Sequence, residues 1–241
     1  MCVTSRDEQL ESLRRQLQKF SGDDATLEEV VEVTSTGISA LDGLLPHAGI
    51  PRGGMVEWLT EETGAGAVVL AVAGVRAALE QGGWWVVVDR RGDFFPPAVT
   101  GWGVSLQKLL IVRPATARDA AWAFEQALRC QGVAVAWQWV ESASERTLQR
   151  WKAAAAMGTG QGVLFRPTAA QRQASWADVR WKVTPLASRE CAGRRLRVEQ
   201  IYCRNGITRG RLELECDDEA GVVRVAAALA DSATGWHAAR A

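Results

Sequence analysis

Short apolar runs alternate with longer amphipathic segments along most of this chain. Strands are predicted within the apolar runs at residues 51–59 (after a glycine turn), 84–89, 109–114, 133–140 and 162–167. Three segments between them predict helices, at residues 68–81, 116–128 and 144–157, and Thr116 is suited to cap the second. Strands and helices in strict alternation indicate an α/β fold with a mostly parallel, twisted sheet flanked by helices.

This rhythm changes after residue 167. The segments 179–183, 195–202 and 211–216 have strand character, and no helical segment separates them. Consecutive strands without crossover helices pair antiparallel, so these segments predict antiparallel C-terminal strands at one edge of the sheet. We expect one domain over residues 33–230 and a short tail over residues 231–241.

The first 32 residues have a different pattern, which predicts an N-terminal helical arm. Between Asp7 and Phe20 the apolar positions are three or four residues apart and form one narrow stripe on an otherwise charged helix. The stripe consists of Leu10, Leu13, Leu17 and Phe20. So narrow a stripe favours docking on a protein partner, as in a two-helix seam. The alternative is that it covers an apolar patch on its own domain.

Composition narrows the classes of protein. The chain has 241 residues, of which 47% are hydrophobic, but it contains neither an apolar run of membrane-spanning length nor an apolar leader. We therefore expect a cytoplasmic protein. The thiols stand singly, which suits a reducing compartment and argues against a zinc site, so no metal or cofactor is expected. They are Cys2, Cys130, Cys191, Cys203 and Cys216.

Charge is balanced overall but unevenly distributed. The net charge is zero, yet fourteen Arg and Lys residues and only three acids lie between Arg146 and Arg211. Such a basic half is typical of a surface for nucleic acid or for an acidic partner. An arginine-rich solvated face explains the same composition equally well.

The segment between the first predicted strand and helix has the setting of a phosphate-binding loop. It reads Thr60, Glu61, Glu62, Thr63, Gly64, Ala65, Gly66, Ala67. Such loops hold phosphate with backbone amides, a lysine and a magnesium-binding Ser or Thr. Here the last two positions are Gly66 and Ala67, and none of the chain's four lysines lies nearby. The loop is therefore interpreted as a vestigial nucleotide loop; an ordinary tight turn is the alternative.

The order of elements, with the residues at their joints, resembles the core domain of the RecA family. Segments 35–42 and 49–53 are similar to the family's approach to its nucleotide loop, and 88–97 and 103–114 follow its second and third strands. Asp89-Arg90-Arg91, Trp122 and the segments 175–180 and 194–199 resemble more closely the ImuA family, RecA-like and often grouped with SulA. The resemblance covers residues 34–218.

Carried onto this sequence, the RecA catalytic positions are unfilled. The phosphate lysine corresponds to Gly66, the magnesium ligand to Ala67 and the water-activating glutamate to the neighbourhood of Arg91. The metal-binding acid falls at residues 137–140, where Glu141 is the only acid nearby. Because phosphoryl transfer depends on electrostatic positioning by these groups together, the chain is predicted not to be an enzyme.

The resemblance implies a non-catalytic adaptor in SOS mutagenesis and translesion synthesis. Its implied partners are RecA, an ImuB-type inactive Y-family polymerase homologue, or both, with self-association and weak non-specific DNA binding as further expectations. The alternatives are a SulA-like cell-division inhibitor and a RecA-like ATPase whose lysine is displaced or supplied by a neighbouring subunit.

One further segment is a candidate loop for DNA or a partner. Residues 168–178 are polar and stand where RecA proteins carry a mobile DNA-binding loop. Arginines within and beside this segment could bind DNA phosphates, and its indole could stack on a base. Docking on a partner protein explains the same residues and is the preferred interpretation. The candidate residues are Arg172, Trp176, Arg180, Arg194 and Arg195.

Overall fold

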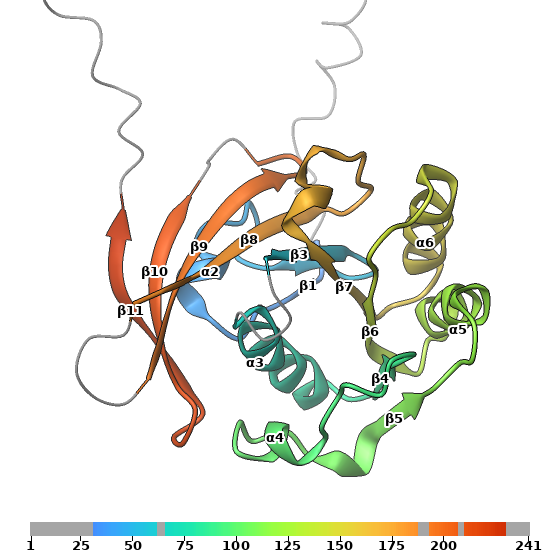
Figure 1. The fold of residues 1–241 in the computed structure, drawn as a ribbon, viewed down its shortest axis with the longest axis horizontal. Helices are drawn as coiled ribbons and strands as arrows, with labels where there is room; N and C mark the ends of the chain where they lie inside the picture. Colours follow the sequence, from blue (N-terminus) through green and yellow to red (C-terminus); the bar gives the residue numbers. More distant parts are fainter. Residues whose placement is uncertain (1–30, 62–65, 188–192, 207–209, 230–241) are drawn as a thin grey trace, which may run out of the picture. The chain divides into compact units, whose positions relative to one another are not determined.

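In the computed structural model of the chain, residues 31–61, 66–187, 193–206 and 210–229 are described, and they build a mixed sheet flanked by helices (Figure 1). The predicted arm and tail lie outside these residues, apart from residues 31 and 32. The large sheet has nine strands in the order β11-β10-β9-β8-β3-β7-β6-β4-β5. Their bounds are β3 Met55–Thr60, β4 Trp84–Val88, β5 Leu109–Val112, β6 Val133–Trp139, β7 Gln161–Pro167, β8 Val179–Leu186, β9 Arg194–Cys203, β10 Arg211–Asp217 and β11 Val222–Leu229. A two-stranded sheet of β1 (Val33–Thr34) and β2 (Ile50–Pro51) precedes them.

Strand direction changes within this sheet, as the sequence predicts. The strands from β5 across to β8 pair parallel, whereas β8, β9, β10 and β11 pair antiparallel in succession. The predicted fold class is confirmed. Strand β11 was not predicted, nor were the short helices α2 (Ser39–Asp42), α4 (Pro97–Thr100), η1 (Leu106–Lys108) and η2 (Thr168–Arg172).

Three longer helices cover the two faces of the sheet (Figure 1). Helix α3 (Ala67–Glu80) packs on one face, and α5 (Ala117–Arg129) and α6 (Glu145–Met157) pack side by side on the other. Thr116 caps α5 as predicted, accepting a hydrogen bond from the Asp119 amide at 3.1 Å. Among the described residues, no helix is both long and apolar enough to cross a membrane.

Tryptophans fill much of the core on the α3 side of the sheet. Trp85 and Trp137 are fully buried and meet edge to face with ring centroids 4.7 Å apart, and Trp58 stacks on Trp181. Their positions in the strands alternate with residues that face α5 and α6, as the pleat of a strand requires. These indoles therefore act as packing elements, the role expected for strand tryptophans.

Candidate functional site

The frame of the nucleotide loop is present at the carboxyl end of β3. The strand ends at Thr60 and α3 begins at Ala67, while residues 62–65 lie outside the described part of the chain. Gly66 caps the helix in a left-handed conformation, with φ +90°, and offers no side-chain hydrogen bond to the helix amides. The frame is thus strand, loop and helix, in the order that phosphate-binding loops use.

An apolar side chain from β9 occupies the space at this helix start. A Cβ atom added to Gly66 would lie 2.4 Å from Leu196 Cδ2 and 2.6 Å from Cδ1. Leu196 is 1% exposed and belongs to the core beneath α3. At the position of the phosphate lysine, the backbone therefore disfavours any side chain and the neighbouring space is already filled.

The position of the metal-binding acid lies among aromatic rings. At the end of β6, Trp139 stacks on Phe165 of β7 with centroids 5.1 Å apart, and Trp137 meets the same ring edge to face at 5.0 Å. Val140 is 7% exposed and closes the strand. Of the side chains at residues 137–140 only Gln138 carries an oxygen, an amide carbonyl, and none supplies a carboxylate for magnesium.

Two charged residues from the remaining catalytic positions pair with each other. Arg91 Nη1 lies 3.0 Å from Glu141 Oε1, and its Nε lies 3.1 Å from Asp93 Oδ2. Arg91 follows β4, where the water-activating glutamate is placed by the RecA resemblance, and Glu141 follows β6. A guanidinium cannot act as a general base, and its pairing engages Glu141, the acid that follows β6 in the sequence.

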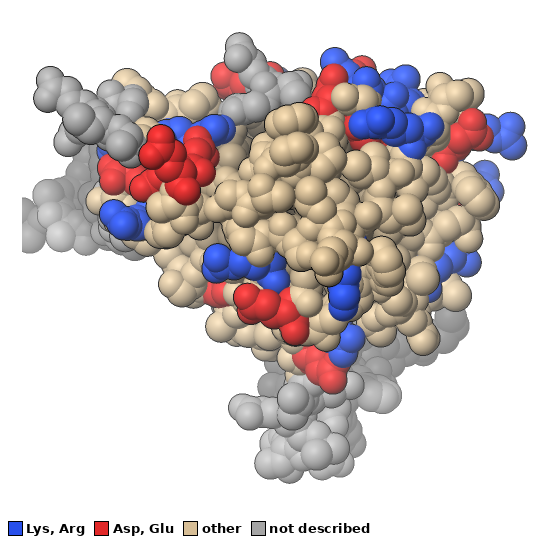
Figure 2. Space-filling model, turned by 90° about the horizontal axis from the view of Figure 1, so that it is seen from below, with Lys and Arg blue, Asp and Glu red and all other residues tan. Residues whose placement is uncertain are grey.

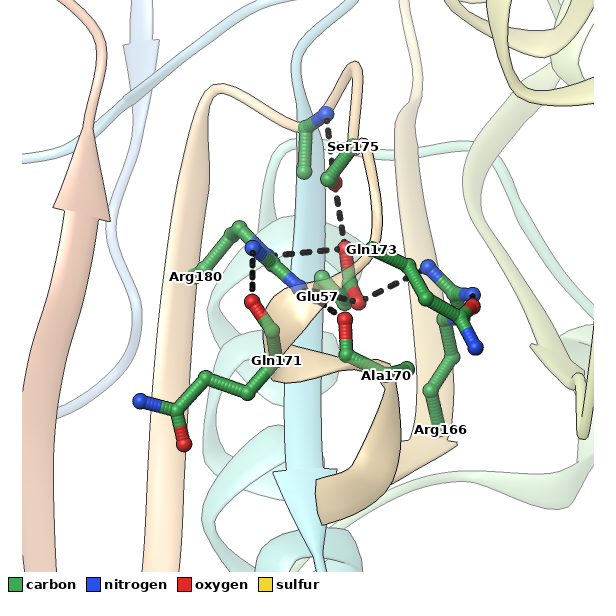
Figure 3. A network of polar contacts seen from close by, with 8 residues as sticks. Glu57, Arg166, Ala170, Gln171, Gln173, Ser175 and Arg180 are labelled. Atoms are coloured by element: carbon green, nitrogen blue, oxygen red, sulfur yellow. Dashed lines mark hydrogen bonds and ion pairs between the residues drawn. The ribbon is translucent and has the colours of Figure 1, made fainter. Parts of the chain in front are cut away.

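The predicted DNA or partner loop is fastened to the sheet by a buried ionic network (Figure 3). Glu57 in β3 is fully buried and pairs with Arg166 at 3.1 Å and with Arg180 at 3.2 Å. Ser175 also donates to Glu57. Burial of one carboxylate among two guanidiniums and a hydroxyl satisfies charges that would otherwise be costly in this environment.

The same arginines donate hydrogen bonds to the loop that follows β7. Arg180 Nη2 donates to the Ala170 carbonyl at 2.8 Å and Nη1 to the Gln171 carbonyl at 3.2 Å, while Arg166 reaches Gln173 Oε1 at 2.6 Å. The expectation that Arg180 is free for phosphate is corrected by these contacts: Arg180 is 8% exposed and bound to Glu57. The sequence reading missed Glu57, whose only signal was a lone acid within an apolar strand.

The other candidate residues of this set are not brought together into one basic surface. Arg172 is exposed, and Trp176 is partly buried against the core under α6. Arg194 pairs with Asp218 at 2.6 Å, and Arg195 pairs with Glu213 at 3.0 Å. Paired charges also dominate the face shown in Figure 2, where basic and acidic side chains lie beside one another around a broad uncharged area. Arginines of the basic half thus pair with acids from elsewhere in the chain, as Arg166 and Arg180 do with Glu57, Arg194 with Asp218 and Arg195 with Glu213.

Neither metal nor thiol chemistry is indicated by the described side chains. No group of three or more His, Cys, Asp or Glu residues in this part of the chain is arranged to hold a metal ion. Burial, together with the nearby Asp218, raises the pKa of Cys216 to about 12. Burial also raises the pKa of Cys203. Both thiols are therefore protonated at neutral pH and poor nucleophiles.

Comparison of the sequence with known proteins identifies the family of this chain. The family model of the RecA N-terminal domain matches residues 11–143. Protein ImuA of Caulobacter vibrioides is 30% identical over 196 residues, which are 72% of this chain and 80% of that protein. Protein RecA of Chlorobaculum tepidum is 32% identical over 128 residues, 52% of this chain and 36% of that RecA.

A solved structure agrees at the level of the fold. The crystal structure of the RadB recombinase superposes with a TM-score of 0.61 at 13% identity, covering 78% of this chain and 97% of RadB. Sequence and fold thus agree on a RecA-like core. The chain belongs to the ImuA family of RecA-like proteins.

Proposed function

We propose that this protein is a non-catalytic RecA-like adaptor in DNA-damage tolerance. It links RecA, an ImuB-type inactive Y-family polymerase homologue, or both, to damage-induced translesion synthesis. Family membership supports the pathway, and the state of the nucleotide loop supports the absence of catalysis. The adaptor role means that binding surfaces, and not phosphoryl transfer, carry the function.

The observation that carries the non-catalytic role is the contact between Gly66 and Leu196. A lysine at position 66 would meet both backbone strain and the Leu196 methyl groups, the nearest only 2.4 Å from its Cβ. A displaced lysine in cis has few sources, since Lys152 is bound to Asp178 at 2.5 Å. Loss of lysine, metal ligand and general base together removes the electrostatic stabilisation on which ATP hydrolysis depends.

Equilibrium binding of labelled ATP in the presence of magnesium tests the absence of nucleotide use. We expect binding at background, with an active RecA protein as the positive control in the same buffer. Saturable, magnesium-dependent binding would instead support the ATPase alternative.

A pull-down with the full chain as bait tests the pathway. RecA and the ImuB-type protein are expected among the retained proteins, and both should survive a wash containing DNase if the contact is between proteins. Retention of cell-division proteins in their place would favour the SulA-like alternative and overturn the adaptor proposal.

A further inference from the structure

The described part of the molecule contains a cleft, here called the α5–α6 cleft, that the nucleotide loop does not use. It has a volume of about 720 Å³ and lies between α5, α6 and the residues that follow β4 and β6. The two helices pack side by side on the sheet face opposite α3 (Figure 1). A cleft of this size accommodates several side chains of a ligand.

Contacts between the two helices hold the cleft open in a defined shape. Trp151 of α6 donates from Nε1 to the Ala121 carbonyl of α5 at 3.1 Å, and its ring meets Phe124 edge to face. Glu125 of α5 is buried between Arg129 and Arg150 and bonds to both. A preformed site loses less conformational entropy on binding than one that must be ordered.

One buried polar group in the cleft lacks a hydrogen-bond partner. Gln138 lies in β6 and lines the cleft, because Trp137 and Trp139 on either side of it pack toward α3. Its side chain is 6% exposed, and its Oε1 has no hydrogen-bond partner among the described residues. An unsatisfied buried carbonyl destabilises the fold, so a ligand that donates an N–H group would recover this cost.

The cleft lining holds as many arginines as carboxylates, but two of its arginines are unpaired among the described residues. Each carboxylate of the lining, on Asp89, Asp93, Glu125 and Glu141, lies within ion-pair distance of an arginine. Arg90 and Arg118 also line the cleft and are exposed, and neither has an ion-pair partner in the described part of the chain. Helices α5 and α6 both begin at the cleft, at Ala117 and after Ser144, which adds the positive ends of two helix dipoles.

An exposed indole completes the rim. Trp122 lies on α5, lines the cleft and is 61% exposed, although most of the chain's tryptophans are core residues. Exposed tryptophans beside a cleft are typical anchors of protein interfaces, where the ring covers an apolar side chain of the partner.

We propose that the α5–α6 cleft binds an acidic peptide segment of a partner protein. A backbone N–H of the peptide bonds to Gln138 Oε1, its carboxylates pair with Arg90 and Arg118, and an apolar side chain packs on Trp122. A peptide suits the cleft better than nucleic acid, because a peptide backbone carries N–H groups that can donate to Gln138 Oε1, whereas a phosphodiester backbone has none. The proposal rests on the adaptor function for the existence of a protein partner.

Fluorescence anisotropy with the full chain tests this proposal directly. The probe is a labelled peptide of glutamate and leucine residues with one phenylalanine; a lysine–leucine peptide and an oligothymidylate of similar length are the comparisons. We expect binding of the acidic peptide that weakens with salt, and a loss of at least about tenfold in affinity in the Arg90→Glu/Arg118→Glu variant. Trp122→Ala should weaken binding by a similar factor.

Matched controls separate the cleft from general charge and exposure. Arg76 and Lys108 are exposed cations that do not line the cleft, so Arg76→Glu/Lys108→Glu should leave the affinity unchanged. Trp84 is 49% exposed and also outside the lining, so Trp84→Ala is the aromatic control.

Gln138→Leu distinguishes a binding role from a structural one. It removes the unsatisfied carbonyl at little change in volume, so the melting temperature should stay the same or rise while peptide affinity falls. The proposal is overturned if the full chain binds no acidic peptide, if the control variants lose as much affinity as the cleft variants, or if only the oligothymidylate binds. Because peptide binding is measured without the natural partner, failure here leaves the pull-down result standing.

Discussion

At the scale of single residues, packing around Gly66 supports the proposal that this RecA-like core does not use a nucleotide. Gly66 holds a left-handed backbone at the start of α3, and Leu196, distant in sequence, fills the space beside it. Glu57 decides how the segment after β7 is held, because Arg166 and Arg180 converge on its carboxylate. In each case a single side chain makes the contact: Leu196 packs beside Gly66, and Glu57 binds the arginines that hold the segment after β7.

Gly66→Lys is expected to destabilise the fold without creating an ATPase. The left-handed φ and the overlap with Leu196 each cost about 1–3 kcal/mol, so the free energy of unfolding should fall by about 2–6 kcal/mol. Urea denaturation measures the change. Gly82→Lys is the control, because Gly82 has φ +105° but nothing within 4 Å of an added Cβ. Equal losses in the two variants would show that Leu196 makes no difference.

Glu57→Gln is expected to destabilise far more than loss of a surface ion pair. Removing the buried carboxylate charge leaves Arg166 and Arg180 uncompensated, which costs about 3–5 kcal/mol. Glu141→Gln breaks the exposed pair with Arg91 and should cost about 0–1 kcal/mol. Chemical denaturation of both variants gives the comparison, and a similar small loss in each would contradict the assigned role of Glu57.

At the scale of elements, the segment from η2 to β8 differs most from expectation. The resemblance to RecA places a mobile loop at residues 168–178, whereas Arg180 bonds to two carbonyls of its backbone and Arg166 bonds to the Gln173 side chain. Next to β8, strands β9, β10 and β11 continue the antiparallel part, and β9 brings Leu196 to the start of α3. These contacts pack the start of α3 and fix the segment after β7, which supports the proposed non-catalytic role.

Limited trypsin digestion tests the fixed loop. Arg172 is exposed, yet cleavage requires several residues around it to unfold locally, and the Glu57 network opposes this. We expect slow cleavage after Arg172 in the natural protein and much faster cleavage in Glu57→Gln under conditions where both remain folded. Mass spectrometry of the fragments identifies the site. Rapid cleavage there in the natural protein would restore the mobile-loop prediction.

At the scale of the whole molecule, the proposed adaptor function assigns the protein's role to binding surfaces and not to a catalytic centre. The arm predicted over residues 1–32 has one narrow apolar stripe, and the domain carries the α5–α6 cleft with its free arginines. An adaptor with two such features engages more than one partner at a time, and linked sites raise the effective concentration of the second partner.

Deletion of residues 1–30 separates docking of the arm from a structural role. The arm is expected to dock on RecA or on another copy of this chain, with about 1.5–3 kcal/mol gross for each of Leu10, Leu13, Leu17 and Phe20 before ordering costs. The shortened protein should melt at nearly the same temperature and lose that partner in a pull-down. A large fall in melting temperature with the partner retained would mean that the stripe covers its own domain.

The sequence by itself determined the alternation of strands and helices, the Thr116 cap and the change to antiparallel pairing, because these depend on local residue patterns. The missing lysine was equally plain. Strand β11 was missed, since one apolar run near the end of a chain has no local signal that distinguishes it from a tail. The local pattern was sufficient for the other strands of the large sheet, for the three longer helices and for the class of the fold.

Only the tertiary structure decided how the charges are paired and which side chain fills the space beside Gly66. Glu57 meets Arg166 and Arg180 across separations of 109 and 123 residues, and Gly66 meets Leu196 through strand pairing at the far side of the sheet. Arg180, Arg194 and Arg195 look like free cations in the sequence but have acidic partners in the fold. Periodicity reports which face a residue occupies, whereas its partner depends on which strands become neighbours.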